Sequence, residues 1–281
     1  MPQSHPLFLP KRARCAGLRS QISFLLLFAL NLSALALSAQ AQVAGSARPL
    51  PDAPQAQTLD AVTVRGAPGE ILHDQEAIWT SPLRLRPHDL KWLAPFALAT
   101  GAAIATDHRA MSQVVSHDAS FNNANVNTSN ALIGGFVAAP VALFGYGHFE
   151  QSDHAREAGI LSGEALVDGV VVEQGMKLIF WRERPTLDSA RGRFFQPSVG
   201  VDSSFPSSHS VLAWATASTI AGEYPSRWTQ IAVYSAATGV SLTRVLGQQH
   251  FPADVLVGST AGWLIGHYIV HRRHWHPSTT R

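Results

Sequence analysis

Apolar residues recur along this chain at helical spacing, in stretches separated by polar connectors. Signals for strands are nearly absent, and no internal repeat is visible. The stretches with a helical pattern are residues 93–106, 131–145, 155–181, 210–223, 229–246 and 253–271. We therefore expect an all-α domain, built as a helical bundle.

The polar segments between these stretches predict the loops and the domain boundary. Residues 121–130 are rich in Asn, and residues 186–205 contain Gly, Pro, Ser and Asp, so both segments are predicted to be loops. Residues 42–75 are rich in Ala, Pro, Gln and Gly without sustained apolar periodicity, which favours a flexible leader. The helical domain is then expected to occupy residues 76–281.

The N-terminus has the pattern of a secretory signal peptide. Four cationic residues between positions 11 and 19 precede an apolar run over residues 22–37, which is followed by Ala39-Gln40-Ala41. The alternative is a retained membrane anchor, but the run is short for a membrane span. We expect residues 1–41 to be removed and the protein to be exported to a bacterial periplasm, with full secretion as the alternative.

The charge balance changes once this segment is set aside. The formal net charge of the chain is +2, and residues 1–41 carry four Lys/Arg and no Asp/Glu, so the charge of the remaining 240 residues is −2. No basic footprint for nucleic acid is left. The single cysteine, Cys15, is lost as well, so the exported domain must be held by its core without disulfides.

Composition also bears on the relation to a membrane, because 46% hydrophobic and 14% charged residues is an apolar balance for a soluble protein. Residues 155–181 carry six charged side chains, which would be costly in a bilayer. Residues 131–145 are uncharged but short and interrupted by Gly and Pro, which favours a buried core helix. We expect a soluble or membrane-associated domain, with an integral membrane protein as the alternative.

The first cluster with candidate chemistry contains two cations, Lys177 and Arg184, followed by Pro185. They are seven positions apart, so on one helix they would project from nearly the same face. Pro185 would end that helix soon afterwards. Two cations on one face suit a dianionic phosphate, whereas Arg182 lies off that face and is expected to be a solvated or structural charge. Taken alone, such a cluster is more often just a charged helix end.

The second cluster is Pro206-Ser207-Ser208-His209, directly before an apolar run. Ser207 or Ser208 suits the N-cap of a helix, so free backbone N–H groups and the positive helix end would face a bound group. Phosphate binds at helix N-termini for this reason. His209 would then be placed to protonate a leaving-group oxygen. An ordinary capped helix is the alternative.

The third cluster joins Arg244, His250 and Asp254. Pro252 suits the first turn of a helix, which would place His250 at its start and Asp254 about a turn inside. A carboxylate that accepts one ring N–H fixes the imidazole tautomer and leaves the other nitrogen free to attack. A structural His–Asp pair is the alternative.

Taken together, the three clusters resemble the signature of the type 2 phosphatidic acid phosphatase superfamily, which includes bacterial acid phosphatases, lipid phosphatases and vanadium haloperoxidases. That signature is Lys, six residues, Arg-Pro; then Pro-Ser-Gly-His; then Ser-Arg, five residues, His, three residues, Asp. The resemblance covers roughly residues 164–271, and departs from the signature at Ser208 in place of Gly and at Thr243 in place of Ser. The matching positions are Lys177, Arg184, Pro185, Pro206, Ser207, His209, Arg244, His250 and Asp254.

This resemblance implies a single helical-bundle domain of the acid phosphatase and haloperoxidase type, acting as a phosphatase. His250, oriented by Asp254, would attack phosphorus and form a phosphohistidine, and His209 would protonate the leaving group. No metal or other cofactor is implied, although vanadate could occupy the site as a phosphate mimic. The residues implied to hold the phosphate are Lys177, Arg184, Ser207, Ser208 and Arg244.

The implied substrates are phosphorylated small molecules or lipids. The apolar composition, together with Trp79, Trp92, Trp181 and Trp263, favours a lipid phosphate presented at a membrane surface, with ordinary core packing of these aromatic residues as the alternative. Two other functions remain open at this point. They are a vanadium-dependent haloperoxidase and a non-catalytic helical binding module.

The C-terminus carries His267, His271, His274 and His276, and the first two form an i, i+4 pair that would suit a metal ion. Arg272 and Arg273 would repel a cation there, and no thiolate or carboxylate lies nearby in sequence. We expect a solvated basic helix end, with possible peripheral contact to anionic lipid.

Overall fold

The structure is a computed structural model that describes residues 62–275. Within this range every regular element is a helix and none is a strand, which confirms the predicted all-α class. The predicted signal peptide and most of the predicted leader lie outside the described residues.

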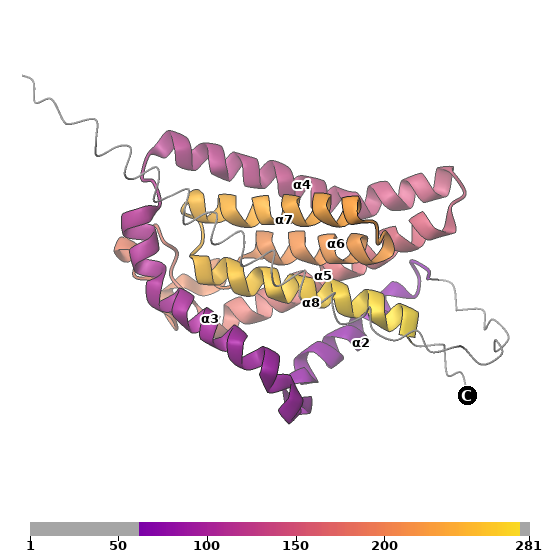
Figure 1. The fold of residues 1–281 in the computed structure, drawn as a ribbon, viewed down its shortest axis with the longest axis horizontal. Helices are drawn as coiled ribbons and strands as arrows, with labels where there is room; N and C mark the ends of the chain where they lie inside the picture. The colour runs from indigo at the N-terminus through magenta and orange to yellow at the C-terminus, as the bar shows by residue number, and fades with distance from the viewer. Residues whose placement is uncertain (1–61, 276–281) are drawn as a thin grey trace, which may run out of the picture.

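Seven α-helices make up this described range, and six of them correspond to the predicted ones. Figure 1 shows α4 to α8 running lengthwise beside one another, with α2 and α3 meeting in a V at one side. Short turns of 3₁₀ or π-helix connect some of them. The α-helices are α2 (Ala67–Thr80), α3 (Leu90–Arg109), α4 (Ala119–Phe149), α5 (Asp153–Phe180), α6 (Ser208–Glu223), α7 (Arg227–Leu246) and α8 (Pro252–Trp275).

Helix α6 lies at the centre of the bundle and packs against α4, α5, α7 and α8. Most of its residues are small and buried, so neighbouring helices can approach closely. Helix α8 makes use of this at Gly262 and Gly266, where an added Cβ would overlap the carbonyl oxygens of Val211 and Ala215. This close approach sets the N-terminal ends of α6 and α8 beside each other.

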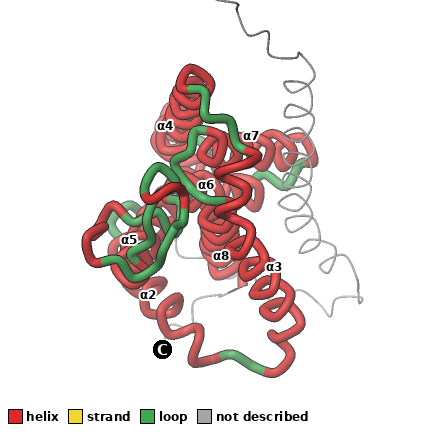
Figure 2. The backbone as a smooth tube through the Cα atoms, turned by 90° about the vertical axis from the view of Figure 1, so that its left-hand side faces the viewer, coloured by secondary structure: helices red, strands yellow, loops and turns green. Residues whose placement is uncertain are grey.

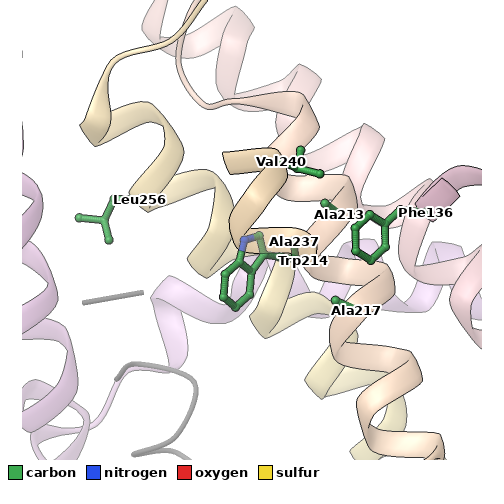
Figure 3. Close-up of a cluster of buried hydrophobic side chains, with 7 residues drawn as sticks. All are labelled: Phe136, Ala213, Trp214, Ala217, Ala237, Val240 and Leu256. Atoms are coloured by element: carbon green, nitrogen blue, oxygen red, sulfur yellow. The ribbon is translucent and has the colours of Figure 1, made fainter. Parts of the chain in front are cut away.

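One hydrophobic cluster joins α4, α6, α7 and α8 around Trp214 (Figure 3). The indole N–H of Trp214 donates to Ser241 Oγ at 3.1 Å, so its one polar group is satisfied within the core. Burial of each large apolar side chain in this cluster contributes about 1.5–3 kcal/mol to stability. The members are Phe136, Ala213, Trp214, Ala217, Ala237, Val240 and Leu256.

The predicted loop at residues 121–130 is wrong, because these residues belong to α4, a continuous helix of 31 residues. Asp118 caps the helix by accepting the Phe121 N–H at 2.8 Å. The polar side chains that suggested a loop bond to their own helix instead, since Asn125 and Thr128 each donate to the backbone carbonyl four residues earlier.

The expectation that residues 131–145 form a buried core helix is also wrong. Helix α4 is the one helix in the described part that is long and apolar enough to cross a membrane by length and composition, and only 17% of its most apolar window is buried. Val141, Phe144 and Phe149 are among its exposed side chains. Helix α4 therefore presents an apolar face on the outside of the bundle.

Residues 67–75, assigned above to the flexible leader, are helical within α2. Gln75 Nε2 donates to Asp168 Oδ1 of α5 at 2.8 Å, and Asp74 accepts a hydrogen bond from Arg272 of α8. Trp79 lies against Gly175, where an added Cβ would meet the indole ring at 2.6 Å. The bundle therefore begins before residue 76.

The basic end of α8 is not solvated as predicted. The Arg272 side chain is only 11% exposed and lies against α2 and α5, where it pairs with Asp74 and with Glu164 at 3.4 Å. Arg273 donates to Glu157 at 2.7 Å. The charge of this helix end is therefore used to join helices within the bundle.

Candidate active site

The predicted site residues meet at the end of the bundle where the α5–α6 and α7–α8 connections lie, the end that faces the viewer in Figure 2. Two hydrogen bonds join these connections. Arg184 Nη1 donates to the Gln249 carbonyl at 3.2 Å, and the Ser207 N–H donates to the Asp254 carbonyl at 3.1 Å. Three clusters that are far apart in sequence are thereby brought together.

His250 lies two residues before the start of α8 and is 2% exposed. Its Nδ1 is 2.8 Å from the carbonyl oxygen of Ser204. Because a carbonyl only accepts, this contact requires the ring proton to be on Nδ1. Nε2 then keeps a free lone pair, which is the form of imidazole that a nucleophile needs.

The direct hydrogen bond expected between His250 and Asp254 is absent. Their closest atoms, Nδ1 and Oδ2, are 3.8 Å apart, which is too long for a hydrogen bond. Asp254 Oδ1 instead pairs with Arg182 Nη1 at 2.5 Å, and Oδ2 accepts the Ser204 hydroxyl and the Phe251 N–H. Asp254 therefore reaches His250 through Ser204, a residue to which the sequence analysis gave no role.

Burial lowers the pKa of His250 to about 4, because it removes the charged ring from water. Asp254 opposes this shift, and the positive charge of Arg244 adds to it. His250 is consequently neutral near pH 7, as attack on phosphorus requires.

His209 lies in the first turn of α6, and its Nε2 is 3.1 Å from Asn130 Oδ1 on α4. Burial, followed by the charge of Arg244, lowers the pKa of His209 to about 3. His209 is therefore neutral in the empty site. A proton donor at this position needs a bound anion to raise its pKa.

The pKa of His209 is also affected by the charged groups around it. Positive charge at Arg244, Lys177 and Arg184 lowers it, as does His250 when it is protonated. The structure therefore brings the three predicted cations and both predicted histidines within electrostatic reach of one another.

Lys177 is buried near the end of α5. It contacts the residue at position 208, which is Ser in this chain and Gly in the superfamily signature. Lys177 Nζ donates to Ser208 Oγ at 2.6 Å and pairs with Glu173 at 3.2 Å. Ser208 Oγ in turn donates to Glu173 Oε2 at 3.0 Å. The hydroxyl at position 208 thus bridges a predicted phosphate ligand and a buried carboxylate, which the sequence analysis did not anticipate.

Arg184 is not on the helix that carries Lys177, contrary to the prediction from their spacing. Helix α5 ends at Phe180, and Trp181 adopts a left-handed conformation with φ 38° and ψ 55°. Arg184 follows in the irregular connection and pairs with the exposed Asp202 at 2.8 Å. Its approach to the site therefore depends on the path of this connection, not on a shared helix face.

Arg244 lies in the last turn of α7 and is buried. Its Nη1 donates to Ser129 Oγ of α4 at 3.2 Å, whereas its Nε has no hydrogen-bond partner among the described residues. Burial and the nearby Arg184 lower the pKa of Arg244 to about 10, so it remains a cation near pH 7. A buried cation with an unsatisfied N–H suits a bound anion.

Ser207 occupies the N-cap position of α6, as one of the two predicted alternatives required. Its side chain makes no capping hydrogen bond and instead accepts from Ser210 Oγ at 3.2 Å. The first N–H groups of a helix have no acceptor within the helix. The positive end of α6 is therefore directed at the site beside Lys177 and His209.

Arg182 was expected to be a solvated or structural charge, and the structural alternative is confirmed, because Arg182 is 1% exposed. Three other residues at the site were missed or misjudged from the sequence. Ser129 and Asn130 were assigned to a loop, and Asp107 was given no role. The sequence did carry one signal for Ser129 and Asn130. The polar stretch at residues 121–130, which precedes an apolar one, is the part of α4 that passes the site.

A helical bundle that places two neutral histidines and three cations at a helix N-terminus has the parts needed to act on a phosphate ester. Residues 158–277 match the sequence model of the PAP2 superfamily, so this region of the chain is similar to that superfamily. The match includes every site residue predicted above.

The chain is also similar to the lipid A 1-phosphatase of Porphyromonas gingivalis. The two are 33% identical over 106 residues, which cover 37% of this chain and 21% of the relative. The chain therefore matches about a fifth of the length of that curated relative. No solved structure matches the chain significantly.

Proposed function

We propose that this protein is a phosphatase that hydrolyses phosphate monoesters or diphosphates through a phosphohistidine intermediate, with lipid phosphates as its substrate class. The observation that carries the proposal is the neutral, buried His250, whose Nδ1 is held by the Ser204 carbonyl beside three cations. The superfamily match and the similarity to a lipid A 1-phosphatase support it.

In the first step, Nε2 of His250 forms a bond to phosphorus as the bond from phosphorus to the leaving oxygen breaks. The electron pair of that bond stays on the leaving oxygen, which takes a proton from His209. In the second step, water attacks phosphorus and gives a proton to His209. The phosphorus–nitrogen bond breaks, so inorganic phosphate leaves and His250 is restored.

The cations serve the charge that develops during both steps. Lys177, Arg184 and Arg244 neutralise phosphate oxygens, so the proposal requires no metal ion. The bound phosphate also raises the low pKa of His209, because negative charge favours the imidazolium form. Binding of the substrate thus favours the protonated form of His209, which is the form that can donate a proton.

Exposed apolar side chains beside the site support a substrate with an apolar portion. Leu178 and Ile179 follow Lys177 directly in α5, and both are about half exposed. Phe195 and Val201 are exposed on the connection that carries Arg184. A lipid chain attached to the phosphate would find apolar contacts at these positions.

The test is turnover by the purified protein, with and without a chelator. An aryl phosphate is compared with phosphatidic acid and a prenyl diphosphate in detergent. We expect chelator-resistant hydrolysis, a higher kcat/KM for the lipids, and an acid-labile phosphoryl group on His250 after rapid quenching. Loss of all activity in chelator would overturn the metal-free mechanism. The assignment as a phosphatase would be overturned if none of the three substrates were hydrolysed. It would also be overturned if the protein, given vanadate, brominated a dye instead of hydrolysing phosphate esters.

We also propose that the protein is exported and associates with the membrane surface from the periplasm. The apolar outer face of α4 and the apolar side chains beside the site support this placement. Alkaline carbonate should release the protein from isolated membranes into the supernatant. Retention in the membrane pellet would contradict a peripheral association.

A further inference from the structure

We propose that Asp107 of α3 is a positioning residue of this site, acting on His250 through Arg182, Asp254 and Ser204. The inference rests on the proposed phosphatase function. Asp107 lies upstream of residues 158–277, so the superfamily match assigns it nothing. The inference makes α3 a necessary part of the active enzyme.

Asp107 is 1% exposed and binds two parts of the site with its two oxygens. Oδ2 accepts from Arg182 Nη2 at 2.7 Å. Oδ1 accepts the backbone N–H of Ala253 at 3.1 Å, in the first turn of α8. One carboxylate thus holds both a buried guanidinium and the helix start that follows His250, where negative charge is favoured.

Arg182 is fixed on every side, so it can transmit the position of Asp107. Its Nη1 pairs with Asp254 Oδ1 at 2.5 Å, and its Nε donates to the Gly192 carbonyl at 3.2 Å. The guanidinium lies over the rings of Phe194 and Phe251, 4.5 and 4.2 Å from their centroids. A planar fork held in this way has one orientation.

The last links connect Asp254 to the nucleophile. Asp254 Oδ2 accepts the hydroxyl of Ser204, and the carbonyl of the same Ser204 accepts Nδ1–H of His250. Without the carboxylate of Asp107, Arg182 would have Asp254 as its one charged partner. Asp254 and Ser204 would then shift, and the His250 ring would lose its fixed orientation.

The first test is Asp107→Asn, which keeps the shape of the side chain and removes its charge. Activity is measured near pH 8, above the pKa of Asp107, which burial raises to about 6. We expect kcat for an aryl phosphate to fall about 10- to 100-fold, because a small misplacement of a reacting group costs that much. KM should stay within about twofold, since no predicted phosphate ligand contacts Asp107. Asp107→Glu, which restores the charge, should recover part of the lost kcat.

The matched control is Asp74→Asn. Asp74 is equally buried and also binds an arginine, Arg272, but it joins α2 to α8 and makes no contact with His250 or Ser204. Both variants should lower the melting temperature, and only Asp107→Asn should lower kcat per folded molecule. Equal kcat values for the two variants after correction for the folded fraction would overturn the proposal.

A second readout does not depend on turnover. Nitrogen-15 NMR of the histidine rings, with the His250 signal identified by its loss in His250→Ala, should show Nδ1–H in the native protein and a mixture of tautomers in Asp107→Asn. An unchanged tautomer would overturn the positioning role. A changed tautomer in a protein that hydrolyses no phosphate ester would support it while rejecting the proposed function. If Asp107→Asn does not fold, Asp107→Glu takes its place. A kcat per folded molecule equal to that of Asp74→Asn, or an unchanged His250 tautomer, would then overturn the proposal.

Discussion

Helix α5 contributes to two buried clusters of charge, and they have opposite balances. The first, which we call the carboxylate cluster, joins Glu164 and Asp168 of α5 to Asp74 of α2 and Arg272 of α8. The second is the candidate site, where Lys177 of α5 meets two arginines and two histidines. The same helix thus supplies two carboxylates to one cluster, and Lys177 with its partner Glu173 to the other.

The two clusters reach electrical balance differently. In the carboxylate cluster, burial raises the pKa of Glu164 and of Asp168 to about 7, so these groups can take up protons. In the site, burial lowers the pKa of His209 and His250, so both are neutral near pH 7, whereas the pKa of Arg244 is lowered only to about 10. The carboxylate cluster is therefore neutralised from within, whereas Arg244 in the site keeps a positive charge that an external anion can neutralise.

The strongest test of this comparison removes the nucleophile. His250→Ala should lower kcat by at least about 10⁴-fold, because loss of a nucleophile removes the covalent route. Far-UV circular dichroism should stay native, since the other contacts of the α7–α8 connection remain. Steady-state turnover with an aryl phosphate measures the effect. A near-normal rate would remove the nucleophile assignment.

The next test reduces the positive charge of the site. Arg244→Gln should lower kcat/KM by about 100-fold, as loss of one preorganised donor to a developing charge does in other enzymes. Arg156→Gln is the control, because Arg156 pairs with exposed Asp153 at the start of α5. Both are assayed with the aryl phosphate. Similar kcat/KM values for the two variants would contradict the role of Arg244.

A smaller effect of opposite sign is expected at Glu173, the carboxylate that pairs with Lys177. Glu173→Gln should lower the inhibition constant of inorganic phosphate by about 3- to 10-fold, because Lys177 no longer shares its charge with a buried acid. Glu157→Gln, which alters a carboxylate of α5 that pairs with Arg273, should leave this constant unchanged. Weaker phosphate inhibition in Glu173→Gln would contradict this, and would show that Glu173 positions Lys177 for the anion.

The smallest effect concerns stability at the carboxylate cluster. Since the pKa of Asp168 is about 7 when folded and near 3.8 when unfolded, the folded protein binds more protons between these values. The contribution of Asp168 to the unfolding free energy therefore falls as pH rises from about 4 to 7. Asp168→Asn should melt a few degrees above the native protein near pH 8 and close to it near pH 4.

The comparison of melting curves isolates Asp168 from other titrating groups. His209 and His250 have pKa values lowered below their unfolded value of 6.5, so they reduce stability as pH falls from about 6.5. They are present in both proteins, and the difference in melting temperature cancels their effect. A difference that does not change with pH would show that Asp168 is ionised throughout.

Local patterns along the chain predicted much of the fold. The apolar periodicity located six of the seven described α-helices, and Ser207 was correctly placed at a helix N-cap. The predictions failed where one local sequence pattern is compatible with two different structures. Asn and Thr side chains favour loops, but in α4 they bond to their own helix. The spacing of Lys177 and Arg184 suggested one helix face, but the helix ends between them.

By itself, the sequence determined the all-α class and the order and spacing of the chemical groups, because helical periodicity and motif spacing are local properties of the chain. Tertiary structure alone decided which of these groups meet. Asp107 pairs with Arg182 across 75 positions of sequence, and Ser204 lies between Asp254 and His250. A buried charge takes the partner that packing brings to it, and neither spacing nor composition encodes that choice.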